Sequence, residues 1–422
     1  MSRGIRFAPP RLAPDLLPDL SWLLARAFGP SAEPGLALSP ADAQRAIGLA
    51  RRFGVAARIA ARTERAVLSA ELGAAADDLS AERRAIAAGD LRLEAAIRAI
   101  AAAAADAAIP IGFLKYAALE LSGALAPGSR GATDIDVLAP SGQEEALRDA
   151  LVAADFAVCD SPGYEHQLAA QIHPRFGAVE VHRLILGVRL RGRSGDRRSA
   201  TLDGLLEAGL AVPYPALPGA VYLPSPEVLA AHAAVHGLGQ HGFEPSAYPA
   251  LRTFADLIDL GWGGPGGRAS AAHVAPWLAE DLSEEELGAL VDLCAELAAG
   301  RARPDGDSAS SLLLRHALAG QLDPGYAGAL KLSLLAPRPS ERSATRRKLS
   351  ALAAALWPSA AQLDAIYGRP ASPWGLLGRR LFRPFDLLRR AARAARRAGE
   401  MDRRERRGDG DPGDGETTEE EA

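Results

Sequence analysis

The sequence predicts an α+β protein in which a small mixed β-sheet is flanked by helical regions. Two short runs, residues 133–138 and 179–182, alternate apolar and polar side chains as half-buried strands do. An alanine-rich stretch from residue 20 to 108 is typical of helices packed through small side chains. Helical patterns return from Ser225 onward. These observations place the sheet in the middle of the chain.

The composition is that of a soluble globular protein. The chain has 422 residues, of which 48% are hydrophobic and 24% are charged, so it has room for two or three domains. Its two cysteines are too few for a disulfide framework or a zinc cluster, which favours a reducing cytoplasm. No signal-peptide pattern is present, and the most apolar stretch, 95–114, is interrupted by charges and Pro110. We therefore expect a cytoplasmic protein without a transmembrane segment.

Shifts in composition divide the chain into six expected parts. Ser39 followed by Pro40 starts a helix, Ser80 is expected to start another, and Pro110 ends the helical stretch. The expected parts are an irregular N-terminus (1–19), a helical N-terminal region (20–108), a catalytic core (109–220), a helical C-terminal region (221–372), a basic amphipathic segment (373–407) and a disordered acidic tail (408–422).

The core itself should alternate strands with short helices. Residues 164–172 are expected to form a strand across the mouth of the site, with Glu165 and His166 assigned to either the site or the surface. Gly187–Asp196 is expected to be a flexible loop, and the alternative is that its arginines bind a polyanion. The other expected elements are strands at 110–114, 133–138, 156–159 and 179–184 and helices at 116–125 and 143–154.

Three carboxylates are predicted to meet at one point of the sheet. Alternate side chains of a strand share a face, so Asp134 and Asp136 project together, and Glu180 and His182 do the same on the second strand. Clustered carboxylates are unfavourable without a cation, and hard oxygen ligands select Mg²⁺ or Mn²⁺. The alternative is that an Asp-x-Asp pattern at a strand edge is simply a solvated turn.

These residues also resemble a known family. The run LKYAAL around Lys115, then Arg130, Asp-Ile-Asp at 134–136 and Glu-Val-His at 180–182 are similar to an uncharacterised, bacterial family of the polymerase-β-type nucleotidyltransferases. The resemblance covers residues 20 to about 300. It implies transfer of a nucleoside monophosphate from an NTP to a hydroxyl group. It also implies a metal held by Asp134, Asp136 and Glu180.

Two basic residues are candidates for the nucleotide. Arginine binds phosphate through two hydrogen bonds and lysine supplies a point charge, so Lys115 and Arg130 are predicted to contact the triphosphate. Each could instead form a salt bridge with a core carboxylate. His182 should face the site and either support the ligands or act as a base. His232 and His236, one helical turn apart, are expected to be packed or to line the site.

One departure from the family pattern supports an alternative function. Tyr116 stands where the family usually has glycine, and glycine lets the backbone approach phosphates closely. The alternative is therefore a catalytically silent module that binds nucleotides or regulates. A glycosyltransferase, which also uses Asp-x-Asp, is disfavoured because a helical stretch, and not a nucleotide-binding α/β half, precedes the motif.

The C-terminal segment suggests a partner of a different kind. Residues 374–397 place apolar side chains on one face of a helix and arginines on the other, so they either pack on the protein or contact anionic lipids peripherally. The acceptor remains open among a small molecule, a protein and RNA.

Overall fold

The computed structural model describes residues 9–30, 37–159, 163–164, 166–191, 197–240, 249–263 and 284–323, together with Tyr326 and Gly378. The expectations for Glu165, for residues 374–397 and for the acidic tail from 408 to 422 concern residues outside these ranges. The same is true of most of the expected helical C-terminal region from residue 324 to 372.

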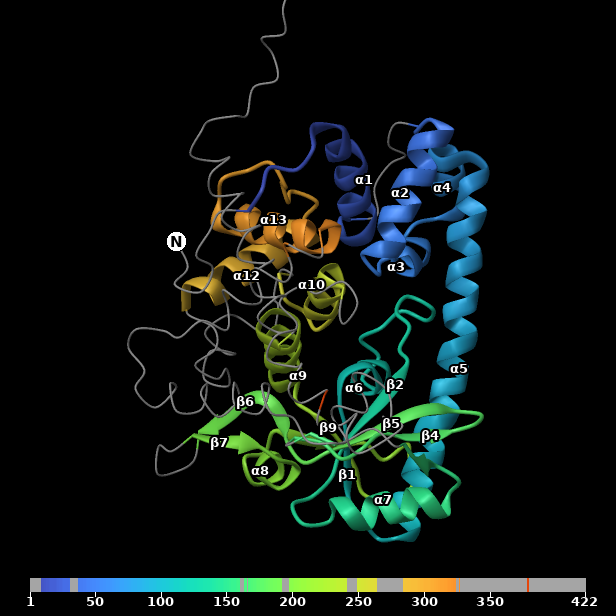
Figure 1. The fold of residues 1–422 in the computed structure, drawn as a ribbon, viewed down its shortest axis with the longest axis vertical. Coiled ribbons are helices and arrows are strands. Elements are labelled where there is room, and N and C mark those ends of the chain that lie inside the picture. Colours follow the sequence, from blue (N-terminus) through green and yellow to red (C-terminus); the bar gives the residue numbers. More distant parts are fainter. Residues whose placement is uncertain are drawn as a thin grey trace, which may run out of the picture.

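The N-terminal region is helical, as predicted (Figure 1). Ser39 caps one helix by accepting a hydrogen bond from the backbone N–H of Asp42, which satisfies a donor that the helix leaves unpaired. The elements are η1 (Pro14–Leu16), α1 (Leu17–Phe28), α2 (Pro40–Arg52), α3 (Ala56–Arg62), α4 (Arg65–Leu72), η2 (Gly73–Ala75) and α5 (Ala76–Asp106).

Helix α5 joins the helical end of the molecule to the sheet. It has 31 residues, which corresponds to a length of about 46 Å at 1.5 Å per residue. Figure 1 shows it running beside α2 and α4 at one end and past α7 at the other. The expected helix start at Ser80 is wrong, because no glycine or proline separates Ala76 from this residue. Its hydroxyl instead donates to the carbonyl of Ala76, inside the helix.

The seven-stranded sheet is mixed, in the order β3-β4-β5-β2-β1-β9-β8. Strands β2 and β5 are parallel, as are β1 and β9, and the other neighbours are antiparallel. A separate pair, β6 and β7, is antiparallel. The strands are β1 (Ile111–Phe113), β2 (Asp134–Leu138), β3 (Ala157–Val158), β4 (Gln171–His173), β5 (Gly177–His182), β6 (Ile185–Arg191), β7 (Arg197–Ala200), β8 (Ala211–Pro213) and β9 (Val221–Pro224).

Two expectations within the core are corrected. Residues 187–191 belong to strand β6 and not to a flexible loop, because Val188 and Leu190 alternate with polar neighbours and bury their side chains. The stretch 164–172 is not one strand. Tyr164 and Gln167 form an isolated bridge, and the strand β4 begins only at Gln171. The helices between the strands are α6 (Lys115–Leu121), α7 (Glu144–Ala153) and α8 (Leu202–Glu207).

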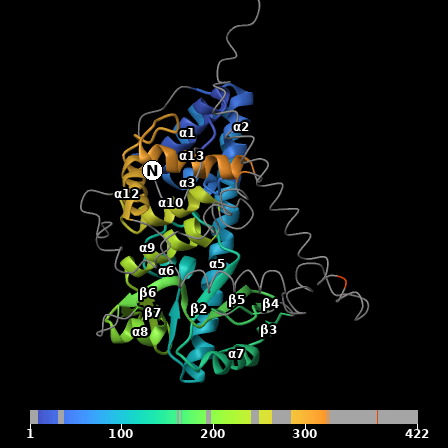
Figure 2. The same ribbon diagram turned by 60° about the vertical axis from the view of Figure 1, so that its left-hand side comes forward.

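Helices α9 and α10 lie between the sheet and the N-terminal helices, whereas α12 and α13 lie beside the N-terminal helices (Figure 2). A π-helix follows α9 directly, and such segments are frequent at functional sites. A side chain at Gly237 in this segment would come within 2.0 Å of Thr253, so only glycine allows the neighbouring helix α10 to pack this closely. The elements are α9 (Pro226–Ala234), η3 (Val235–Gln240), α10 (Ala250–Asp259), α12 (Glu284–Ala298) and α13 (Ala309–Leu322).

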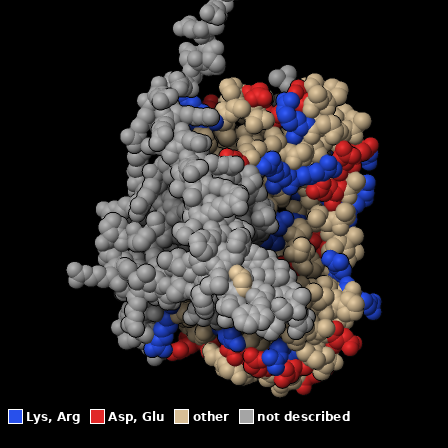
Figure 3. Space-filling view, viewed as in Figure 1, with Lys and Arg blue, Asp and Glu red and all other residues tan. Residues whose placement is uncertain are grey.

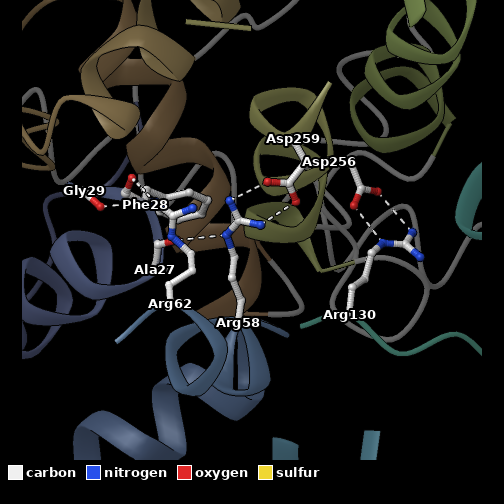
Figure 4. A network of polar contacts seen from close by, with 8 residues as sticks. All are labelled: Ala27, Phe28, Gly29, Arg58, Arg62, Arg130, Asp256 and Asp259. Carbon is white, nitrogen blue, oxygen red and sulfur yellow. Dashed lines mark hydrogen bonds and ion pairs between the residues drawn. The ribbon is translucent and has the colours of Figure 1, made fainter. Parts of the chain in front are cut away.

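Helix α10 is tied to both halves of the molecule by ion pairs (Figure 4). Asp259 accepts two hydrogen bonds from Arg58 of α3, at 2.5 and 2.9 Å. One turn earlier, Asp256 pairs with Arg130, which precedes β2. Arg58 also donates to the backbone carbonyl of Ala27, which extends the contacts to α1. Helix α10 therefore sets the position of the helical region relative to the sheet.

The surface carries both charge signs. In Figure 3, basic and acidic side chains are interspersed over the described part of the face shown, without one large basic area. Among the described helices, none combines the length and the apolar character that crossing a membrane would require.

Candidate active site

Parallel pairing of β2 with β5 builds the site. Asp136 lies directly opposite Glu180, and Leu138 lies opposite His182. Because side chains alternate along a strand, the hydrophobic neighbours Ile135 and Val179 point into the core, with exposed fractions of 1% and 0%. The predicted common face of the polar residues on the two strands is confirmed.

Three of these side chains come together closely. His182 Nε2 lies 2.8 Å from Asp136 Oδ1 and 3.7 Å from Glu180 Oε2. One ligand atom from each of the three residues can be chosen so that all lie within 4.8 Å of one another. Two carboxylates and an imidazole at this spacing form a donor set that fits one divalent cation.

The group that the structure brings together differs in one member from the predicted metal ligands. Asp134 lies two residues before Asp136, at the start of β2 and opposite Ala178, and it is not among the three residues whose ligand atoms lie within 4.8 Å. It remains part of the same electrostatic environment. Burial, followed by the charges of Asp136 and Glu180, raises the pKa of Asp134. His182, predicted to support the ligands or act as a base, takes the third place in the group.

Opposite charges stabilise the buried Asp136. Its side chain is only 3% exposed, and Lys115 Nζ lies 2.7 Å from its Oδ1. Burial alone would raise the pKa of Asp136, but Lys115 and His182 hold this pKa far below its usual value. Burial also opposes the charges on Lys115 and His182, yet contact with Asp136 raises the pKa of both. Asp136 is therefore ionised, with the Lys115 ammonium and the His182 ring in contact with its Oδ1.

Lys115 reaches Asp136 through an unusual backbone. Its φ is +45°, a left-handed conformation that is uncommon for residues other than glycine and that costs free energy. The preceding residue, Leu114, donates its backbone N–H to the carbonyl of Asp136 at 3.0 Å. The turn from β1 into α6 is thus fixed against β2, and this turn sets the position of the Lys115 side chain.

Arg130 lies outside this cluster. Its Nε and Nη2 donate to the two carboxylate oxygens of Asp256 at 2.7 and 3.0 Å, and both side chains are buried. Figure 4 shows the two side chains facing each other in this two-pronged contact. The salt bridge stated as the alternative for Arg130 is what the structure contains. Asp256 itself is 2% exposed.

Tyr116 points away from the carboxylates. Its hydroxyl donates to Asp90 of α5 at 2.7 Å, and the second oxygen of Asp90 accepts the backbone N–H of Gly128 at 3.1 Å. The ring is 3% exposed and lies beneath the guanidinium of Arg130, 5.6 Å from its centre. The tyrosine therefore joins α6 to α5 and to the turn before β2.

A small pocket of about 20 Å³ lies beside Lys115, which is enough for a water-sized molecule. His232 and His236 line it, with their rings 5.7 Å apart, so the prediction that this pair is packed or lines the site is confirmed. Burial, followed by the neighbouring His236, lowers the pKa of His232 well below its ordinary value. Asp256 also borders this pocket.

The family comparison agrees with the geometry. The family described as "Uncharacterised nucleotidyltransferase" matches residues 39–260, more than half of the chain. The chain belongs to this family. The match is narrower than the expected 20 to 300, but it includes α2 to α10 and every residue of the site. None of the curated proteins or solved structures compared with the chain matches it.

The family match spans the elements that carry the site residues. The match includes the parallel pair of β2 and β5 and also the helices that carry Lys115 and the two histidines. It also includes α10, whose Asp256 holds Arg130. Of the helical region before the sheet, α2 to α5 lie within the family match, which begins at residue 39.

Proposed function

We propose that the protein transfers a nucleoside monophosphate from an NTP to a hydroxyl group, with Mg²⁺ or Mn²⁺. The observation that carries this proposal is the register of β2 and β5, which sets Asp136 opposite Glu180 and brings His182 within ligand distance of both. Family membership supports the general kind of reaction.

Asp136, Glu180 and His182 would hold the cation, with Asp134 beside them. A bound divalent cation supplies charge neutralisation of the triphosphate and alignment of the attacking oxygen. Carboxylate oxygens suit Mg²⁺ and Mn²⁺, and the imidazole is compatible with the latter. The donor set therefore fits the metals expected from the sequence.

Lys115 is assigned to the nucleotide phosphates. Its side chain is 21% exposed, so the ammonium group can bind phosphate while remaining close to Asp136. Arg130 is assigned a positioning role, because Asp256 already accepts its two-pronged contact. In this assignment the arginine holds α10 against the strand that carries Asp134 and Asp136.

A silent nucleotide-binding module is the second candidate. It was motivated by Tyr116 in place of glycine, since a side chain there removes close backbone contact with phosphates. The ring is buried against α5 and does not fill the space beside Asp136, which favours an active enzyme. Binding of an NTP without turnover, in the presence of either metal, would support the silent module.

The decisive experiment measures transfer and metal binding together. Purified protein is incubated with each labelled NTP and Mg²⁺ or Mn²⁺, and incorporation into itself and into a cell extract is scored. Asp136→Asn and Glu180→Gln should each lower the rate by about a thousandfold or more, because each removes a charged ligand. Both should also weaken Mn²⁺ binding followed by electron paramagnetic resonance.

A matched control separates these losses from general effects of charge. Asp149→Asn removes a carboxylate that is 69% exposed on α7 and should leave both readouts unchanged. Circular dichroism checks that each variant is folded. Near-normal turnover in folded Asp136→Asn or Glu180→Gln would refute the assignment of the site.

The proposal also includes the chemical class of the acceptor and the cellular location. The acceptor is a hydroxyl group on a small molecule, a protein or RNA, and the incubation with cell extract distinguishes these.

We also propose a cytoplasmic protein that contacts anionic lipids through residues 374–397, because several arginines near such a surface give salt-sensitive attachment. Deleting residues 374–422 should abolish flotation with anionic vesicles. Equal flotation of the truncated and full-length proteins would refute this contact.

A further inference from the structure

A row of aromatic rings leads from the carboxylate cluster to the surface. His182, which contacts Asp136, lies 5.8 Å from the ring of His166. His166 in turn stacks on Tyr164, with ring centres 5.7 Å apart and planes 19° from parallel. Exposure increases along the row, from a buried His182 to a Tyr164 that is 57% exposed. The accessible ring is thus two ring contacts from the proposed metal ligands.

The backbone holds these rings in place. Tyr164 donates its N–H to Gln167 at 2.9 Å, and Arg183 donates its N–H to the carbonyl of His166 at 2.8 Å. Gln167 also forms a bridge with His182 at the end of β5. The segment is therefore fastened to the strand that carries Glu180 and His182, and its rings are positioned before any ligand binds.

An adjacent glycine allows this close arrangement. A side chain at Gly163 would come within 2.8 Å of the backbone oxygen of Gln167 and within 2.9 Å of the backbone nitrogen of Ala169. A residue with a side chain would push Tyr164 away from Gln167. The tight turn thus supports the exposed tyrosine at a fixed position beside the site.

An exposed aromatic ring beside a phosphate-transfer site is suited to a flat aromatic ligand. Tyrosine offers a large apolar face at a small cost in conformational entropy, and stacking of a base on such a ring tolerates every base. In an NTP, only the ribose separates the nucleobase from the α-phosphate, which must lie at the metal ligands. A ring located two ring contacts from His182 lies at a suitable distance for that base.

We propose that Tyr164, backed by His166, forms the stacking platform for the nucleobase of the NTP. This inference rests on the proposed function, and it adds the part of the substrate that the carboxylates and Lys115 do not contact. Because stacking uses the face of the ring and no hydrogen bond of its hydroxyl, the platform should accept purine and pyrimidine nucleotides alike.

The test measures binding and not turnover. Calorimetric titration with each NTP and Mg²⁺ is compared with titration by inorganic triphosphate, which has no base. Tyr164→Ala should weaken NTP binding about tenfold or more and leave the affinity for inorganic triphosphate unchanged. Tyr164→Phe keeps the ring and should bind NTP as the unmodified protein does. Leu91→Ala, at a side chain 69% exposed on α5, serves as the control for loss of surface area.

The outcomes separate this inference from the proposed function. If the unmodified protein binds NTP and Tyr164→Ala binds it equally well, the platform is refuted while the proposed transfer stands. Equal loss of NTP and inorganic triphosphate affinity in Tyr164→Ala also refutes stacking, because the base then contributes nothing. If the unmodified protein binds no NTP with either metal, the proposed function itself fails.

Discussion

The pair between Arg130 and Asp256 offers a quantitative test of how the site is assembled. Its two hydrogen bonds are 2.7 and 3.0 Å long, and the side chains are 9% and 3% exposed. Asp256→Asn keeps the shape of the side chain but leaves the guanidinium buried without its counter-charge. Removing one partner of a buried ion pair costs about 3–5 kcal/mol of folding free energy.

Urea denaturation and thermal melting measure this cost. At roughly 2–4 °C for each kcal/mol in a domain of this size, Asp256→Asn should lower the melting temperature by about 10 °C. The double variant Arg130→Met with Asp256→Leu should recover much of the loss, because well-packed apolar residues can replace a buried pair with little cost.

An exposed pair provides the matched control. Arg98 and Glu94 lie one turn apart on α5 with side chains 62% and 48% exposed, so Glu94→Gln should cost only about 0.3–0.5 kcal/mol. A loss below about 1 kcal/mol in Asp256→Asn, within the range of ordinary surface pairs, would refute the structural role of Arg130. A large loss of NTP affinity in the folded double variant would instead show that Arg130 contacts the phosphates.

Two further predictions concern buried side chains away from the carboxylates. Tyr116→Phe removes the hydrogen bond to Asp90 and should cost about 1 kcal/mol of stability in urea. The affinity for NTP should stay within twofold. A fivefold change in this affinity, in either direction, would show that the Tyr116 ring contacts the phosphates. Burial, with the nearby Arg315 charge, lowers the pKa of His316 to about 3. In the unfolded chain a histidine binds a proton below about pH 6.5, whereas the buried His316 stays neutral down to about pH 3. The free energy of unfolding therefore decreases as the pH falls from 6.5 towards 3. At pH 5 the free energy of unfolding is lower by about 2 kcal/mol. The urea midpoint of His316→Phe should therefore drop less between pH 7 and pH 5 than that of the unmodified protein. An identical drop in both proteins would contradict the prediction.

Local sequence determined the elements and the faces of the strands. Ser39 before Pro40 and the alternation at 134–137 depend only on capping and on the two-residue period of a strand, so both are confirmed. The common face of Glu180 and His182 follows from the same period. The same reasoning failed at Ser80, because a residue that can cap a helix can equally lie within one.

Only the tertiary structure decided which of these polar residues meet. Asp256 lies 126 residues from Arg130, and no local pattern links the two side chains. The register of β2 against β5 places His182, and not Asp134, in the closest group with Asp136 and Glu180, because strand pairing depends on contacts along the whole sheet. The direction of the Tyr116 ring was likewise beyond sequence reasoning, since packing against α5 sets it. A repeating pattern tells which face a side chain occupies, whereas its partners come from residues far away in the chain.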